Sequence, residues 1–192
     1  MQDDKMPLRY EDARHRIGNG DLLLFRAHSL SSKIIQAVGR SAYSHAAMAV
    51  WCRQFDILFC CEVREFCGAR AVTLSSQVDR FSGQIDVFGV VNESFNRDGA
   101  AGEMLRKTGA AYGYTAICCS ALIHAPFLRF FFRPNFRDSN GGWLPEYCSA
   151  AVANAARIGG KVDPVHNLND VWSEPGDLGR SLLWNYSFTL TK

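Results

Sequence analysis

The chain has 192 residues, of which 47% are hydrophobic and 21% are charged, and its formal net charge is +2. This size and composition are ordinary for a globular protein with one core, so we expect residues 1–192 to form a single domain. The small charge, with no helix-turn-helix, zinc-finger or aromatic RNA-binding pattern, argues against a nucleic-acid partner.

The first half of the chain predicts mainly strands, separated by polar turns. A buried strand follows the turn at Gly20-Asp21, and two apolar segments flank a polar turn to give a β-hairpin. The predicted elements are, in order, a short helix or arm at 1–18, a strand at 22–25, a helix at 30–38, the hairpin strands at 46–51 and 57–63, and strands at 71–74 and 85–90.

The second half predicts helices and one late strand. The expected order is a helix at 97–111, an apolar run at 112–132, a loop at 133–145, a small-residue helix at 147–156 and a strand at 184–190. The apolar run contains His124, Pro126 and Arg129, so it is too interrupted for the roughly 20 apolar residues that a membrane span needs.

The cysteine pattern predicts free thiols in a reducing compartment. There are seven cysteines, an odd number, and none forms a C-x-x-C pair, which argues against a zinc site. The N-terminus is polar and is followed by no apolar signal core. We therefore expect no signal peptide, no metal and no organic cofactor, and a location in the cytoplasm or in association with a phage or cell envelope.

Cys148 is the best candidate for a nucleophile among the seven. It stands where a loop rich in glycine and proline gives way to a helix, and the unpaired N–H groups of a first helical turn favour a thiolate. The same groups could stabilise an oxyanion. The alternative is that Cys148 is a small apolar residue on a packed helix, as buried cysteines often are.

His45 and Glu62 are candidates for its partners. His45 opens an apolar strand directly after a small-residue loop, and Glu62 lies in an otherwise apolar strand, where a carboxylate needs a partner. If the hairpin turns between Arg53 and Gln54, the two residues face each other with Cβ atoms about 5 Å apart. A structural histidine and a solvent-facing glutamate are the alternatives, and Asp21 and Asp86 are rival carboxylates that could instead cap backbone.

Several segments in this order resemble the circularly permuted papain-like hydrolases of the NlpC superfamily, in the YiiX/YebB-like group. The matching pieces span residue 20 to about 160 and include Gly20-Asp21, Tyr43-Ser44-His45, Cys61-Glu62-Val63 and Glu146-Tyr147-Cys148-Ser149. Ala150 replaces a Glu that is frequent in that group, and the aromatic stretch at 127–136 is unusual.

The resemblance implies an α+β, permuted papain-like fold, with an antiparallel sheet packed against helices and the nucleophile at a helix N-terminus. It places Cys148, His45 and Glu62 in the triad positions and gives Asp21 a structural role, with Tyr43, Ser44 and Tyr147 as further substrate or structural candidates. It also implies a cysteine hydrolase of the amidase or peptidase type. Its substrate would be a peptide, a peptidoglycan fragment or a lipid-linked acyl group, cleaved through a thioester.

Two other functions stay open. One is a permuted acyltransferase of the lecithin:retinol type, although its Asn-Cys-Glu-His motif is absent, and the other is a papain-like binding module without turnover. Aromatic and basic residues also alternate in one segment, which favours an acyl-chain pocket or contact with an anionic membrane surface, unless they are core. These residues are Phe127, Arg129, Phe130, Phe131, Phe132 and Arg133.

Overall fold

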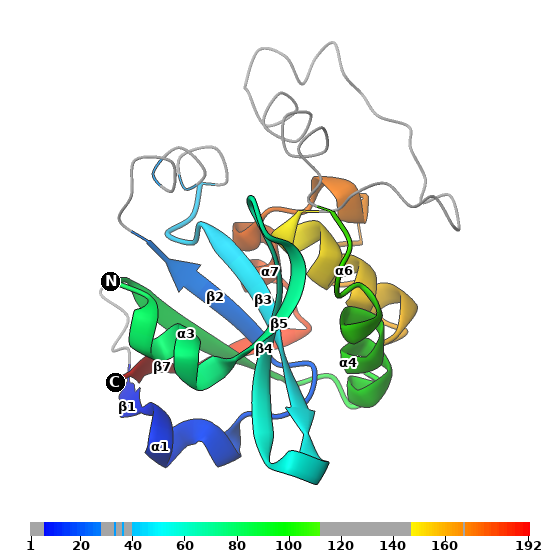
Figure 1. Cartoon of the computed structure of the whole chain (residues 1–192). Coiled ribbons are helices and arrows are strands. Elements are labelled where there is room, and N and C mark those ends of the chain that lie inside the picture. Colours follow the sequence, from blue (N-terminus) through cyan, green and yellow to red (C-terminus); the bar gives the residue numbers. More distant parts are fainter. Residues whose placement is uncertain (1–5, 28–32, 34–35, 37–39, 112–146, 167) are drawn as a thin grey trace.

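The protein is an α+β molecule built around one mixed sheet, seen in a computed structural model (Figure 1). The structure describes residues 6–27, 33, 36, 40–111, 147–166 and 168–192. Within them the sheet has seven strands in the order β1-β7-β6-β2-β3-β4-β5. Their bounds are β1 (Pro7–Arg9), β2 (Leu22–Arg26), β3 (His45–Cys52), β4 (Ile57–Arg64), β5 (Gly68–Thr73), β6 (Gln84–Val90) and β7 (Trp184–Thr191).

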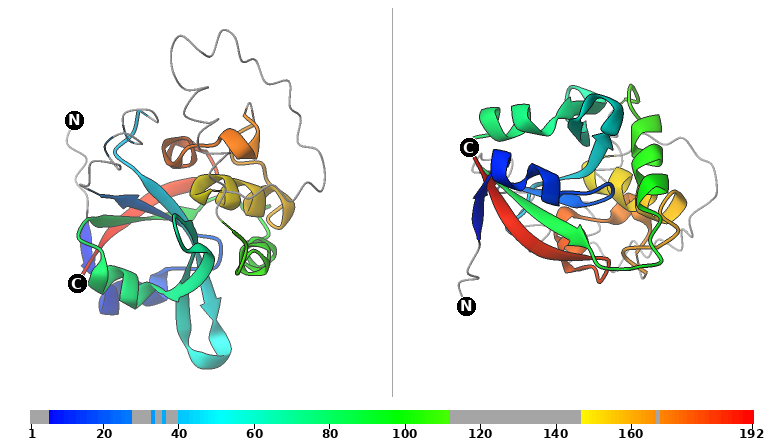
Figure 2. Two further views of the ribbon diagram at one scale, coloured as in Figure 1. Left: turned by 45° about the horizontal axis from the view of Figure 1, so that its top comes forward. Right: turned by 90° about the horizontal axis from the view of Figure 1, so that it is seen from below.

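Helices cover both faces of this sheet (Figure 2). The α-helices are α1 (Tyr10–Ala13), α3 (Leu74–Arg80), α4 (Arg97–Arg106), α6 (Cys148–Ile158) and α7 (Pro175–Arg180), and the 3-10 turns are η1 (Arg14–Arg16), η2 (Arg53–Phe55) and η4 (Asp170–Trp172). Because side chains alternate along each strand, the sheet has two apolar faces. One packs against α4, α6 and α7, and the other against α1 and α3.

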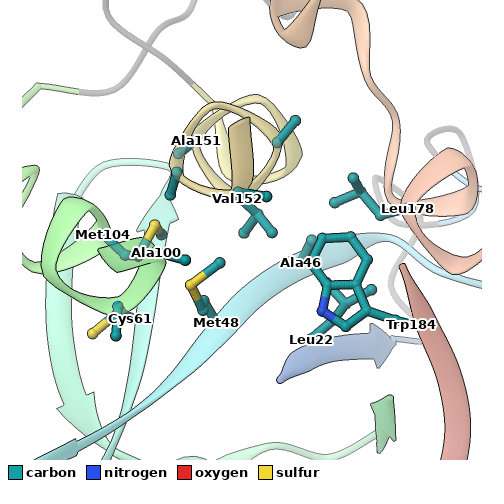
Figure 3. Close-up of a cluster of buried hydrophobic side chains, with 14 of the residues drawn as sticks. Leu22, Ala46, Met48, Cys61, Ala100, Met104, Ala151, Val152, Leu178 and Trp184 are labelled. Carbon is teal, nitrogen blue, oxygen red and sulfur yellow. The ribbon is translucent and has the colours of Figure 1, made fainter. Parts of the chain in front are cut away.

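The face under α6 is built from small side chains on the helix and larger ones on the sheet. Ala151 and Val152 of α6 point toward Met48 on β3, and Met104 of α4 lies beside Cys61 on β4 (Figure 3). At Gly99 and Gly159 a Cβ atom would clash with the backbone of the other glycine, so α4 and α6 approach at backbone contact there. Small residues on both helices thus bring α6 down onto β3 and β4.

Most of the predicted strands are present, with shifted ends. β2, β3, β4, β6 and β7 match the predicted ranges to within one residue at each end. The sheet is not wholly antiparallel as expected, because β1 pairs parallel with β7 at one edge. β5 begins at Gly68 rather than at residue 71, and Leu74, predicted to end a strand, begins helix α3.

The helical predictions are confirmed for the helix that begins at Cys148, whereas α4 ends earlier than predicted. It stops at Arg106 instead of residue 111, because the chain turns at Gly109 (φ 92°) and Ala110 then pairs with β5. Helix α7 was not predicted. The predicted helix at 30–38 lies largely, and the apolar run at 112–132 wholly, outside the described residues.

Candidate active site

Cys148 is the first residue of α6, directly after the extended N-cap residue Tyr147. Tyr147 is buried, and its hydroxyl donates to the carbonyl of Ser173 at 3.2 Å, which fixes the start of the helix. The Cys148 side chain is buried, with 6% of the residue exposed. Burial raises the pKa of this thiol, but the charge and hydrogen bond of His45, with the N–H groups of Ala46 and Ser149, outweigh burial and lower the pKa.

His45 is the first residue of β3, and its ring lies between a thiol and a carboxylate. The ring packs edge-on against Phe25, with 5.1 Å between ring centres, and its Nε2 atom lies 2.6 Å from Oε2 of Glu62. That contact leaves Nδ1 for Cys148. Burial lowers the pKa of His45, but the charges and hydrogen bonds of Cys148 and Glu62 raise it to about 10. The pair therefore favours thiolate and imidazolium.

Glu62 on β4 has a fully buried side chain. Its Oε2 atom accepts from His45, and its Oε1 atom accepts from Nε and Nη2 of Arg70 at 2.8 and 2.5 Å. Burial raises the pKa of this carboxyl, but the hydrogen bonds and positive charges of His45 and Arg70 lower it to about 2. Glu62 is consequently ionised across the physiological pH range.

The predicted opposition of His45 and Glu62 across the hairpin is wrong by two residues. In the observed register Ala47 lies opposite Glu62, because the chain reverses through η2 and Asp56, whose φ is 50°. A shift of two residues keeps every side chain on its face of the sheet, whereas a shift of one would have reversed it. His45 and Glu62 are therefore diagonal neighbours on one face, and long side chains bridge that separation.

Arg70 is the site residue that sequence reasoning missed. It lies directly opposite Glu62 in the pairing of β4 with β5. The signal that could have found it is a single cationic residue in the strand that follows the strand of a buried acid. A tight turn between the two strands places such a residue opposite the acid. Because β5 was predicted to begin at residue 71, Arg70 fell outside the expected strand.

Asp21 makes no contact with Cys148, His45 or Glu62 among the interactions described here and instead binds backbone N–H groups. Its side chain is buried and accepts hydrogen bonds from the N–H of Gly18 at 2.7 Å and of Val90 at 3.1 Å, and it forms an ion pair with Arg97. Burial raises the pKa of Asp21, and these partners only partly offset that rise. Asp21 precedes β2, whose far end carries Phe25 beside His45.

Tyr43 and Ser44 lead directly into His45 and hold that loop against the sheet. The Tyr43 hydroxyl donates to Oδ2 of Asp86 at 2.8 Å, and the Ser44 hydroxyl donates to the Phe25 carbonyl at 3.3 Å.

Asp86, the other rival carboxylate, is fully buried in β6. It accepts hydrogen bonds from the side chains of Arg26 and Thr189 as well as from Tyr43.

The remaining described cysteines differ from Cys148 in their surroundings. Burial, with the nearby charge of Glu62, raises the pKa of Cys60 well above its ordinary value and that of Cys61 to about 12. Cys52 is a half-buried free thiol and Cys67 an exposed one. Cys118 and Cys119 lie outside the described residues.

The aromatic and basic stretch at 127–133 lies outside the described residues, so the predicted membrane contact stays a prediction. In the described part of the chain, no helix combines the length and apolar character that crossing a bilayer requires.

No protein-family model matches the sequence, and no curated protein matches it. Among solved structures, the chain is similar to the metalloprotein YiiX from Escherichia coli O157:H7, with a TM-score of 0.64 and 14% sequence identity over 92% of this chain and 99% of that one. In the residues described here, no group of three or more His, Cys, Asp or Glu side chains is placed to hold a metal ion. The likeness shows that the chain has a YiiX-like fold.

Proposed function

We propose that the protein is a cysteine-dependent hydrolase in which Cys148 is the nucleophile, His45 the acid and base, and Glu62 the group that orients the imidazole. The observation that carries this proposal is the position of His45, whose ring interacts with the Cys148 thiol on one side and with the Glu62 carboxylate on the other. A thiolate held beside an imidazolium is the reactive form of a cysteine nucleophile.

The proposed reaction is acyl transfer to water. The Cys148 sulfur forms a bond to the acyl carbon of an amide or ester, and the imidazolium of His45 gives its proton to the leaving nitrogen or oxygen as the old bond breaks. His45 then takes a proton from water, which attacks the thioester and releases the acid and the thiolate. The first N–H groups of α6 have no partner within the helix and could stabilise the oxyanion of each step.

The arrangement supports an enzyme over a binding module. A thiol that served only to pack α6 would gain nothing from a buried, ionised triad, which is costly to desolvate. The substrate classes that we propose are cell-wall peptides and lipid-linked acyl groups. The permuted acyltransferase differs only in the second step, in which an amine or alcohol replaces water.

The test is a panel of peptides, peptidoglycan fragments, lipoamides and acyl esters, incubated with the wild type and with Cys148→Ala. We expect turnover of at least one class by the wild type, a covalent acyl adduct on Cys148 by mass spectrometry, and a loss of at least about 1,000-fold in the variant. Addition of an amine acceptor separates transfer from hydrolysis. Equal turnover by both proteins would overturn the assignment. A Cys148 as slow to alkylate at neutral pH as an ordinary thiol would favour the binding module.

A further inference from the structure

The edge strand β5 places the charged side chain of Arg70 beside Glu62, the most deeply buried of the three proposed catalytic residues. Arg70 lies opposite Glu62 in the β4–β5 register, and its side chain is 29% exposed whereas that of Glu62 is fully buried. The guanidinium therefore approaches the carboxylate from β5, and His45 approaches it from β3, the strand on the other side of β4.

The hydrogen bonds divide the two carboxylate oxygens between the two partners. Nε and Nη2 of Arg70 both donate to Oε1, whereas Nε2 of His45 lies at Oε2. Because each oxygen of Glu62 has its own partner, the rotation of the carboxylate plane is fixed. The orientation of that plane in turn fixes the orientation of the His45 imidazole. Only a planar guanidinium offers two N–H groups to one acceptor in this fixed geometry, which a lysine cannot reproduce.

The charges of the four groups alternate in sign along the chain of contacts. In the reactive form the Cys148 thiolate, the His45 imidazolium, the Glu62 carboxylate and the Arg70 guanidinium sum to zero. Without the guanidinium, two negative groups would share one imidazolium in a largely buried site, and burial of an uncompensated charge is costly. Arg70 therefore favours both the carboxylate and, at longer range, the thiolate.

The position of Arg70 is fixed independently of its contact with Glu62. The backbone of the preceding residue, Ala69, pairs with the 109–110 segment, with Ala69 N to Ala110 O and Gly109 N to Ala69 O both at 2.8 Å. Gly68 has a φ of 70°, and a Cβ atom there would clash with the Ala110 carbonyl. β5 is thus held on both of its edges at the residues that precede Arg70.

A second arginine near the same carboxylate does not make this contact. Arg64, on β4 itself, has its Nη1 atom 3.9 Å from Oε1, beyond hydrogen-bond distance, and its side chain is 46% exposed. The two arginines therefore carry the same charge near Glu62, but only Arg70 is hydrogen-bonded to it. The other titratable groups near Glu62 are His45, Cys60 and Cys61.

We propose that Arg70 is a positioning residue of the triad, which acts through Glu62 to hold His45 in line with Cys148 and to keep the thiolate–imidazolium pair formed. The inference rests on the proposed function, because it assigns a role in the same reaction.

The test compares the pH dependence of Cys148 alkylation by iodoacetamide, read by peptide mass spectrometry, in the wild type, Arg70→Met, Arg70→Lys and the matched control Arg64→Met. Without Arg70, protonation of Glu62 and Cys148 moves to higher pH. We expect the acid limb of the profile to rise by about one pH unit or more in Arg70→Met, so that the rate falls roughly tenfold at a pH on the acid side of the wild-type limb. Arg70→Lys should lie between Arg70→Met and the wild type, and Arg64→Met should follow the wild type.

The outcomes separate the two proposals. If wild-type Cys148 titrates near 9 like an ordinary thiol, the proposed function fails. If wild-type Cys148 has a lowered pKa but Arg70→Met keeps the same acid limb, or Arg64→Met shifts it equally, only the role of Arg70 is overturned. A purely structural arginine would lower the urea midpoint without moving the limb. Should Arg70→Met not fold, an upward shift in Arg70→Lys supports the proposal and an unchanged limb in that variant overturns it.

Discussion

The Nε2 atom of His45 lies 2.6 Å from Oε2 of Glu62, and the two residues are diagonal neighbours on adjacent antiparallel strands. The contact joins the start of β3 to the end of β4, so it is made within one hairpin and does not depend on helix packing. The imidazole is therefore oriented by the sheet, and α6 brings the thiol to it. Each of these parts can be perturbed separately.

Removal of the Glu62 charge should weaken the nucleophile. In Glu62→Gln the imidazolium loses its carboxylate, so the pKa of His45 falls and that of the Cys148 thiol rises. We expect the rate of Cys148 alkylation at pH 6.5 to fall by about 10- to 100-fold. Glu65→Gln, an exposed glutamate in the following turn, is the matched control and should react as the wild type does. A Glu62→Gln variant that is as reactive as its control would contradict the triad.

The same carboxylate should make stability depend on pH at the acid end. Its pKa is about 2 in the folded protein instead of the ordinary 4.5. Because the folded value is depressed, this stabilisation is complete above pH 4.5 and is lost as the pH falls toward 2. We measure the unfolding free energies of the wild type and Glu62→Gln by urea unfolding. The difference between the two should be smaller by about 2 kcal/mol at about pH 3 than at about pH 5. A constant difference would mean that Glu62 is not held ionised.

Asp21 should prove to be a structural residue. Asp21→Ala leaves two backbone N–H groups and Arg97 without their acceptor, at a cost of about 2–4 kcal/mol in unfolding free energy. Asp21→Asn should cost less, because it keeps one acceptor oxygen. It also removes the buried negative charge whose desolvation raises the pKa of Asp21. In both variants, while folded, the pH profile of Cys148 alkylation should match the wild type. A changed profile in the folded protein would place Asp21 in the reaction.

Tyr43 should contribute through Asp86. Tyr43→Phe removes one hydrogen-bond donor from the fully buried carboxylate of Asp86 and keeps the ring. We expect a loss of about 1–2 kcal/mol, measured by urea unfolding at pH 7. Because the loop that ends in His45 is anchored at this hydroxyl, Cys148 alkylation should also slow, by a few-fold. An unchanged unfolding midpoint would mean that Asp86 finds a substitute donor.

Local sequence pattern predicted the central strands and the start of α6 because these elements are marked by apolar runs and by a change from loop to small residues. It also identified the three residues that the structure brings together, since each is chemically out of place in its segment. His45 and Glu62 interrupt apolar strands, and Cys148 opens a helix.

The features that were missed depend on long-range pairing or on short caps. The parallel contact of β1 with β7 joins the two ends of the chain and has no local signature. Helix α7 begins with Pro175 at its first position, and Glu174 and Asp177 cap it reciprocally, but no helix was predicted for this short segment. The hairpin register depended on a left-handed residue, Asp56, that sequence did not single out. The contact of Arg70 depended on the pairing of β4 with β5 and on the true start of β5.

The proposed base and the proposed nucleophile come from widely separated parts of the chain, an early hairpin and a late helix. During translation the histidine and glutamate leave the ribosome well before α6 has been made. Any product truncated before α6 keeps the earlier cysteines but lacks Cys148, so it holds the His45 imidazole without the thiol that pairs with it in the folded protein. Reactivity of Cys148 thus reports that synthesis and docking of the late helix are complete.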